Sequence, residues 1–297
     1  MIPIDNVLID APDCCGKTTL YAGLHKATGF KYNVQDRSNL SMLCYARLYG
    51  REETHHLDAL CREVACANNF YVVPLMPLPV VLDRLYRRGD ECQDEASLTR
   101  LHELFESVVG VLERLPNVHV VRKVMSKEET ASEVKDAIGR YSDMSGADLG
   151  DLLSLWVPKE GLRETQFRAR LDVSPDHVDD EIMSDSHEGE YYDTILKALR
   201  SIVSDEIAGR NPYGKPQGRD SRRFFYADRS CISSIHFLPR AEATKVIVGL
   251  RSTDAVRNGR KDLRFLQHLA ATIPREFGWK PEKIELDVTF DSLHVID

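Results

Sequence analysis

The residues with the clearest chemical role lie at positions 11–19, where the sequence reads APDCCGKTT directly after the apolar run at 7–9. In a loop of this type, backbone N–H groups and the positive end of the next helix surround an anionic phosphate. Lys17 is expected to reach the β- and γ-phosphates of a nucleotide, and the Thr18 hydroxyl is expected to bind Mg²⁺. The residues expected to contact the nucleotide are Asp13, Cys14, Cys15, Gly16, Lys17, Thr18 and Thr19.

A second set of charged residues favours transfer of a phosphoryl group over hydrolysis of a nucleotide. Asp36 ends an expected strand and can orient Mg²⁺ or its waters, and Arg37 beside it can hold a second anionic substrate. Arg84 and Arg88 share one helix face at i,i+4 and can neutralise the charge that develops during phosphoryl transfer. A solvated basic helix end is the alternative for these two arginines.

A third set of residues, in the second half of the chain, suits a pyrimidine nucleotide. Its arginines can bind a phosphate, and its cysteine can attack an electron-poor pyrimidine carbon as a thiolate. Each residue also has an alternative interpretation when it is considered alone: the cysteine as a core residue, the arginines as surface residues, and Ser252 or Asp254 as the cap of a helix. The set consists of Ser221, Arg222, Arg223, Cys231, Arg251, Ser252, Asp254, Asp262 and His294.

Length and charge limit the classes of protein to consider. A chain of 297 residues is long enough for two domains, and its net charge of −8 argues against broad, sequence-independent binding of nucleic acid. No apolar run is long enough to cross a bilayer, and the first residues lack the layout of a signal peptide. The seven cysteines have no regular spacing, so we expect reduced thiols in a cytoplasmic protein without a zinc site.

The elements that must position these residues follow from the apolar pattern. From 7 to about 141, apolar runs alternate with amphipathic stretches, which predicts an α/β domain around a parallel sheet. Within it we expect helices near 19–26, 40–68, 79–88, 96–114 and 127–141. The small polar residues at 142–148 are typical of a linker.

The second half is less regular and predicts a smaller α+β domain. Its acidic stretch at 176–190 is typical of a solvated loop, with a metal site as the weaker alternative. We expect helices at 191–208 and 261–272 and strands at 223–226, 244–250 and 284–288. The predicted domains are therefore a P-loop parallel-sheet domain at 1–142 and an α+β domain at 150–297.

The first 140 or so residues resemble thymidylate kinase and related nucleotide kinases. The resemblance rests on Asp13 in the loop, on the sequence Asp36-Arg37-Ser38, and on the arginine-rich segment that ends at 90. It implies that the loop binds ATP, that Asp36 and Arg37 hold the metal and the acceptor phosphate, and that the arginine-rich segment closes over the phosphates. The Asp-Arg pair comes earlier in this chain than in that family, so the acceptor stays open. No Asn-Lys-x-Asp element is present in the sequence, which disfavours a GTPase.

The third set resembles the C-terminal half of thymidylate synthase and of deoxycytidylate hydroxymethylase. Cys231, the Arg251-Ser252-x-Asp254 element and Asp262 follow one another at the spacing of that family. The resemblance implies a homodimer in which Arg222 and Arg223 reach the phosphate bound by the partner subunit. It also implies that His294 binds the sugar and that folate is the cofactor of any one-carbon chemistry.

Asp262 stands where the uracil-specific synthases have Asn. A carboxylate there accepts a hydrogen bond from an exocyclic amine such as cytosine N4, which favours a cytosine-type base. Ile232 and Ile296 replace the His and Tyr of the family, so we expect this domain to bind a pyrimidine nucleotide, with catalysis by Cys231 as the alternative.

Together these features predict an ATP- and Mg²⁺-dependent kinase for a (deoxy)pyrimidine nucleotide, including a hydroxymethylated one. Modified pyrimidines of this kind are typical of a DNA phage. Three alternatives stay open: a bifunctional hydroxymethylase–kinase for dCMP or dUMP, a kinase that acts on hydroxymethylpyrimidine within DNA, and a non-catalytic nucleotide-sensing subunit.

Overall fold

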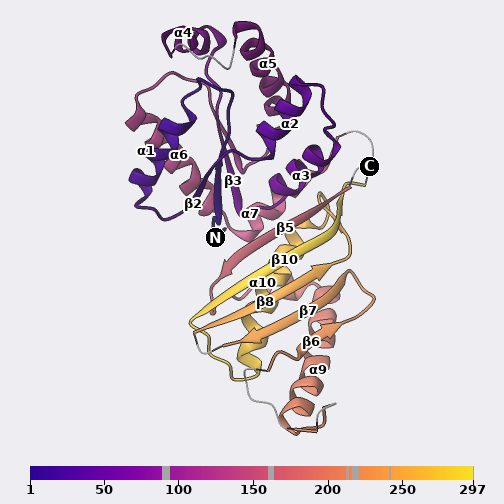
Figure 1. The fold of residues 1–297 in the computed structure, drawn as a ribbon. Helices are drawn as coiled ribbons and strands as arrows, with labels where there is room; N and C mark the ends of the chain where they lie inside the picture. The colour runs from indigo at the N-terminus through magenta and orange to yellow at the C-terminus, as the bar shows by residue number, and fades with distance from the viewer. Residues whose placement is uncertain (89–93, 160–163, 212–213, 216–220, 241, 297) are drawn as a thin grey trace. The chain divides into compact units, whose positions relative to one another are not determined.

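The computed structural model describes residues 1–88, 94–159, 164–211, 214–215, 221–240 and 242–296. The chain divides into two compact units. We call Ile4–Asp143 the N-terminal unit, and Met1–Pro3 together with Met144–Asp297 the C-terminal unit. Each unit has its own sheet (Figure 1).

The N-terminal unit is built on a parallel sheet of four strands in the order β2-β1-β3-β4. The strands are β1 (Asn6–Ile9), β2 (Asn33–Asp36), β3 (Asn69–Pro74) and β4 (Val118–Val121). All six residues of β3 are buried, as expected of a central strand covered on both faces. This is the predicted α/β architecture.

Helices cover both faces of this sheet (Figure 1). On one face, α1 (Lys17–Thr28) packs against α6 (Lys127–Ser142), where a side chain on Gly23 would meet Ala131. On the other face, α2 packs against both α3 and α5. These three helices and α4 are α2 (Asn39–Leu48), α3 (Thr54–Val64), α4 (Leu78–Arg88) and α5 (Glu95–Leu112).

The helical region predicted at 40–68 consists of two helices. The chain turns between α2 and α3, and Gly50 takes a left-handed conformation there with φ of 61°. Glycine adopts this conformation at little cost, so the break follows from its position.

The C-terminal unit has a mixed sheet of six strands in the order β5-β10-β8-β7-β6, with the two-residue strand β9 paired to β10. β10 runs antiparallel to β5 and parallel to β8. Along each long strand buried residues alternate with more exposed ones, so one face of the sheet forms the core. The strands are β5 (Glu164–Val173), β6 (Phe224–Ala227), β7 (Ile232–Pro239), β8 (Ala243–Leu250), β9 (Thr253–Asp254) and β10 (Lys283–His294).

Helices of the C-terminal unit pack on this sheet and on one another. α10 contacts β5 and β10, α9 contacts β6, and α7 packs along α10. The helices are α7 (Gly146–Leu152), α8 (Asp180–Ser184), α9 (Ser186–Ile207) and α10 (Gly259–Glu276), with a 3₁₀ turn η1 (Leu153–Trp156). The α+β class predicted for this half is therefore confirmed.

Two predictions for this half are wrong. Residues 146–148 are not part of a linker, because Ser145 and Asp148 form a capping box that begins α7. The acidic stretch at 176–190 is not a solvated loop, since it holds α8 and the first turn of α9. Its carboxylates pair with Lys261 and Arg264 of α10, which removes the repulsion that the sequence suggested. The strands β5 and β7 were not predicted at all.

No helix among the described residues is long and apolar enough to span a membrane.

Candidate functional site

The phosphate loop of the N-terminal unit has the backbone geometry of an anion cradle. β1 ends at Ile9, and the loop then turns into α1, whose N-cap Gly16 takes φ of 87°. Cys14 also takes a positive φ, of 63°, whereas Ala11 does not, so the loop tolerates Ala11 in place of the usual first glycine. The first turn of α1 begins at Lys17 without a side-chain cap, which leaves its N–H groups for a ligand.

A cavity of about 650 Å³ lies over this loop. Arg84 and Arg88 line it together, as their i,i+4 spacing on α4 predicted. Arg84 also donates a hydrogen bond from Nη1 to the carbonyl oxygen of Cys14, at 3.1 Å, which ties α4 to the loop. The cavity is lined by residues 12–20 and by Pro74, Met76, Arg84, Arg88, Met125, Ser126, Lys127 and Thr130. A phosphate chain placed there would meet cations from three elements.

Lys17 and Asp36 face each other across the loop. Lys17 Nζ lies 3.6 Å from Asp36 Oδ1, so the end of β2 comes close to the start of α1. Mg²⁺ is commonly held by one or two protein oxygens together with substrate phosphates. The Thr18 hydroxyl and the Asp36 carboxylate fit that donor set. Among the described residues, no group of three or more His, Cys, Asp or Glu side chains could hold a metal ion by itself.

Arg37 lines a second, smaller cavity of about 240 Å³. Its guanidinium lies over the Tyr45 ring, 5.9 Å from the centroid, and the Tyr45 hydroxyl donates to Asp13 of the phosphate loop at 2.7 Å. Tyr45 stacks on Tyr49, with ring centroids 6.1 Å apart and an interplanar angle of 13°. The cavity is lined by Arg37, Met42, Tyr45, Ala46, Tyr49, Arg51 and His56. An aromatic shelf flanked by arginines suits a base and a phosphate.

The two loop cysteines differ in chemical environment. Cys15 is buried, and burial raises the pKa of its thiol to about 12, so it stays protonated. Cys14 is partly exposed and lines the larger cavity. Cys15 is thus a packing residue of the loop, whereas Cys14 can contact a ligand through its backbone.

The C-terminal unit has a cavity of about 190 Å³ that brings Cys231 and Asp262 together. Cys231 immediately precedes β7, and Asp262 lies in the first turn of α10, which follows β9. The cavity is lined by His187, Glu188, Tyr191, Cys231, Ile232, Leu250, Asn258, Lys261, Asp262, Phe265 and Leu266. Its volume suits a single base better than a whole nucleotide.

Asp262 contributes a carboxyl group to the lining of this cavity. Burial raises the pKa of its carboxyl to about 6, although the Thr253 hydroxyl donates to Oδ2 at 2.9 Å and favours the ionised form. Glu188 nearby also raises this pKa by its negative charge. The carboxyl therefore changes charge close to neutral pH, which is unusual for an aspartate.

Glu188, Tyr191 and Lys261 are cavity residues that the sequence did not reveal. Glu188 is buried, with its Oε2 2.8 Å from Lys261 Nζ, and Lys261 also donates to Asp185 at 3.0 Å. Tyr191 stacks on Phe265, with an interplanar angle of 9°. Glu188 lies within the acidic stretch interpreted as a loop. The helical spacing of the buried residues Glu188, Tyr192 and Ile195 was the available signal.

The other residues of the predicted set lie outside this cavity lining. Arg251 donates to the carbonyl oxygens of Arg229 and Asp228, so it braces the turn before Cys231. Arg223 pairs with Glu206 at 3.3 Å, and Arg222 contributes its carbonyl oxygen as partner to His236. A role of Arg222 and Arg223 toward a partner subunit stays a prediction.

Asp254 and His294 are paired across two neighbouring parallel strands. They are opposite each other between β9 and β10, and the Asp254 carboxylate accepts from the N–H groups of Val256 and Arg257. Ser252 directly precedes β9. Asp254 therefore shapes the turn that leads to α10.

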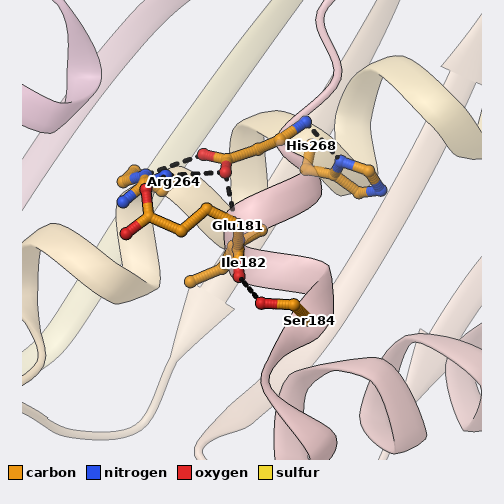
Figure 2. A network of polar contacts seen from close by, with 6 residues as sticks. Glu181, Ile182, Ser184, Arg264 and His268 are labelled. Atoms are coloured by element: carbon orange, nitrogen blue, oxygen red, sulfur yellow. Dashed lines mark hydrogen bonds and ion pairs between the residues drawn. The ribbon is translucent and has the colours of Figure 1, made fainter.

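A polar network fixes the segment before α9 (Figure 2). Arg264 donates to both carboxylate oxygens of Asp179 at 2.7 Å, and also to Glu181 at 2.8 Å. The Asp179 N–H donates to His268 Nδ1 at 3.0 Å, which requires an unprotonated Nδ1. Burial lowers the pKa of His268, consistent with a neutral ring. This network holds α8, and with it the start of the helix that carries Glu188, against α10.

The solved structures that are similar to the N-terminal half include the following two. One is the YorR protein of Bacillus subtilis in complex with phosphorylated GDP, with a TM-score of 0.39 and 19% identity over 47% of this chain and 99% of that chain. The other is deoxyadenosine kinase of M. mycoides with the products dCMP and a flexible dCDP, with a TM-score of 0.34 and 11% identity over 46% of this chain and 99% of that chain. No protein-family model matches the chain, and no curated protein matches it. Both TM-scores are below 0.5, so a function for this chain can be derived only from the geometry of its cavities.

Proposed function

We propose that this protein transfers the γ-phosphoryl group of ATP, in the presence of Mg²⁺, to a (deoxy)pyrimidine nucleotide, including a hydroxymethylated one. The observation that carries the proposal is the convergence of the α1 N-terminus, Lys17, Arg84 and Arg88 on one cavity. Phosphoryl transfer needs positioning and neutralisation of charge on the equatorial oxygens, and these groups supply both.

The second cavity supports an acceptor rather than water as the nucleophile. Arg37 lies at its edge and directly follows Asp36, which is close to Lys17. In the proposed reaction, an acceptor phosphate oxygen held by Arg37 attacks the γ-phosphorus. The bond from that phosphorus to the β–γ bridging oxygen breaks, and ADP leaves. The hydrogen bond from the Tyr45 hydroxyl to Asp13 joins a residue of this second cavity to the phosphate loop, which supports the proposal.

The test is incubation with labelled ATP and a panel of nucleoside monophosphates, including hydroxymethylpyrimidine nucleotides. Lys17→Ala is expected to abolish labelling of every acceptor, because it removes the cation at the transferred phosphate. Lys26→Ala is the matched control, since Lys26 is an exposed lysine near the end of the same helix. Unchanged transfer by Lys17→Ala would overturn the proposal.

For the C-terminal unit we propose binding of a pyrimidine nucleotide with a preference for cytosine. The supporting observation is that the Asp262 carboxyl and Cys231 line one cavity, beside the aromatic pair of Tyr191 and Phe265. Equilibrium binding of dCMP and dUMP tests the preference, and equal affinities would contradict it. Release of tritium from C5 of either nucleotide with folate, lost in Cys231→Ser, would instead support the bifunctional hydroxymethylase–kinase.

Two other hypotheses are separated by the same labelling experiment. A panel that includes duplex DNA with hydroxymethylpyrimidine tests a kinase that acts on DNA, whose target base would have to leave the stack. Nucleotide binding without labelling of any acceptor would favour a nucleotide-sensing subunit.

A further inference from the structure

Asp10 is a fully buried carboxylate between β1 and the phosphate loop. Its Oδ1 accepts a hydrogen bond from the N–H of Ala11 at 2.9 Å. Its Oδ2 accepts three more, from the Ser38 N–H at 2.9 Å, the Ser38 hydroxyl at 2.7 Å and the Ser41 N–H at 2.9 Å. Burial raises the pKa of this carboxyl, whereas the hydrogen bonds from Ser38 and Ser41 favour its ionised form, in which such bonds are strong.

These bonds join two parts of the candidate site. One oxygen holds the first residue of the phosphate loop, and the other holds the turn between β2 and α2, which contains Arg37. The turn is anchored a second time, where the Arg37 N–H donates to the carbonyl oxygen of Ile9 at 3.0 Å. Arg37 takes φ of 96°, a conformation that a residue with a side chain adopts only when its surroundings enforce it.

The N-terminus of α2 is satisfied by the same network. Ser38 caps the helix and accepts from the Leu40 N–H at 3.1 Å, while Asp10 takes the Ser41 N–H. The Asn39 N–H donates to Glu63 at 3.1 Å, and the Tyr71 hydroxyl also donates to Glu63. Two carboxylates at a helix N-terminus complement its positive end, so the turn has one preferred position.

We propose that Asp10 is a positioning residue that fixes Arg37, and thus the acceptor phosphate, relative to the phosphate loop. The inference rests on the proposed phosphoryl transfer for its catalytic meaning. Its structural content is independent of that reaction: the hydrogen-bonded carboxyl of Asp10 sets the distance between Ala11 and the turn at 36–38.

The Asp10→Asn variant tests the charge and the bonding with almost no change in volume. An amide has only one oxygen, so its NH₂ group must face either the Ala11 N–H or the three donors from Ser38 and Ser41. The NH₂ group of the amide and the N–H or O–H group that it faces are both donors, so their repulsion would increase the distance between the turn and the loop. A displacement near 1 Å of a positioning group can reduce catalysis by about a hundredfold.

We expect Asp10→Asn to lower kcat/KM for the acceptor by about tenfold or more, mainly through KM. ATP affinity, measured by direct binding, is expected to fall by less than kcat/KM for the acceptor, because Asp10 contacts the phosphate loop only through the Ala11 N–H and does not line the ATP cavity. Hydrogen exchange of residues 36–42 is expected to become faster, with α1 unchanged. An unaltered acceptor KM, or an equal loss of ATP affinity, would overturn the proposal.

Two further variants keep the test decisive if Asp10→Asn does not fold. Ser38→Ala removes one of the four donors to Asp10 together with the side-chain cap of α2, and it is expected to raise the acceptor KM by a smaller factor than Asp10→Asn. Ser41→Ala also removes a buried hydroxyl but leaves all four donors to Asp10, so it is expected to stay within about twofold of the wild type. Equal effects of both substitutions would contradict a specific role of Asp10.

Failure of the proposed function is distinguishable from failure of this inference. If the wild type transfers no phosphoryl group, hydrogen exchange alone decides: faster exchange at 36–42 in Asp10→Asn supports the positioning role, and unchanged exchange refutes it. If the wild type does transfer, the split between acceptor KM and ATP affinity decides.

Discussion

Replacement of Asp262 by Asn should stabilise the C-terminal unit at neutral pH. The ionised carboxyl is partly buried beside Glu188, and its pKa in the folded protein is about 6 rather than the usual 3.8. A difference of about two pKa units corresponds to about 3 kcal/mol, which the folded state loses when Asp262 ionises. An Asn side chain carries no charge and its oxygen can still accept the Thr253 hydroxyl.

The pH dependence gives the sign of the effect. Because the folded state binds this proton more tightly than the unfolded chain, the favourable contribution is complete below about pH 4 and disappears as the pH rises through 6. The variant and the wild type should therefore have similar stability at pH 4. At pH 7.5 the variant should be more stable, by up to about 3 kcal/mol.

Urea unfolding followed by tryptophan fluorescence measures this difference for the relevant unit, because both tryptophans, Trp156 and Trp279, belong to the C-terminal unit. Asp193→Asn on the exposed face of α9 is the control and should leave stability unchanged. A variant that is less stable at pH 7.5, or a difference that does not change with pH, would refute the reasoning. The cytosine preference should weaken in the same variant, which would indicate that the costly charge serves ligand binding.

The remaining predictions concern two glycines and one buried histidine. Gly150→Ala should destabilise the C-terminal unit by about 1–3 kcal/mol, because the new Cβ would lie 2.5 Å from Arg260 Cα. A Cβ added at Gly139 in α6 would have no neighbour within 4 Å, so Gly139→Ala should instead stabilise the N-terminal unit by about 0.5–1 kcal/mol. Urea unfolding followed by circular dichroism compares the two variants. Burial lowers the pKa of His268, so the unfolded chain takes up this proton first and stability should fall as the pH drops through about 6.5. His268→Asn, whose Oδ1 can replace Nδ1 as acceptor for Asp179, should flatten that dependence when measured in the Asp262→Asn background, and an unchanged slope would contradict it.

The parts of the fold that were predictable from the sequence depend on local signals. The strand, loop and helix around Lys17 follow one another within about twenty residues, and Arg84 and Arg88 are one helical turn apart. Hydrophobic alternation and turn residues identify such segments without knowledge of distant contacts. The α/β class of the first half was predictable for the same reason.

The parts that were missed depend on contacts between distant residues. The Asp179 carboxylate meets Arg264, 85 residues away, and Asp185 meets Lys261, 76 residues away. Without those partners, an acidic stretch is expected to be solvated, and only the helical spacing of Glu188, Tyr192 and Ile195 indicated that Glu188 is buried. Asp10 was overlooked because three of its four donors come from a turn about thirty residues later.

The first three residues of the chain belong to the C-terminal unit, although they precede the phosphate loop. The Met1 carbonyl oxygen accepts from the Asp172 N–H at 3.0 Å, and the Met1 amino group donates to the carbonyl oxygen of Asp172, which is 171 positions later in the chain. During synthesis Met1–Pro3 cannot form these hydrogen bonds until β5 has been made, whereas the N-terminal unit, which lies between the two segments in sequence, can already fold. Once folded, that unit holds its two ends at a fixed separation, so a far shorter flexible loop remains to be closed. The unit that is made first thereby lowers the entropic barrier to completing the other.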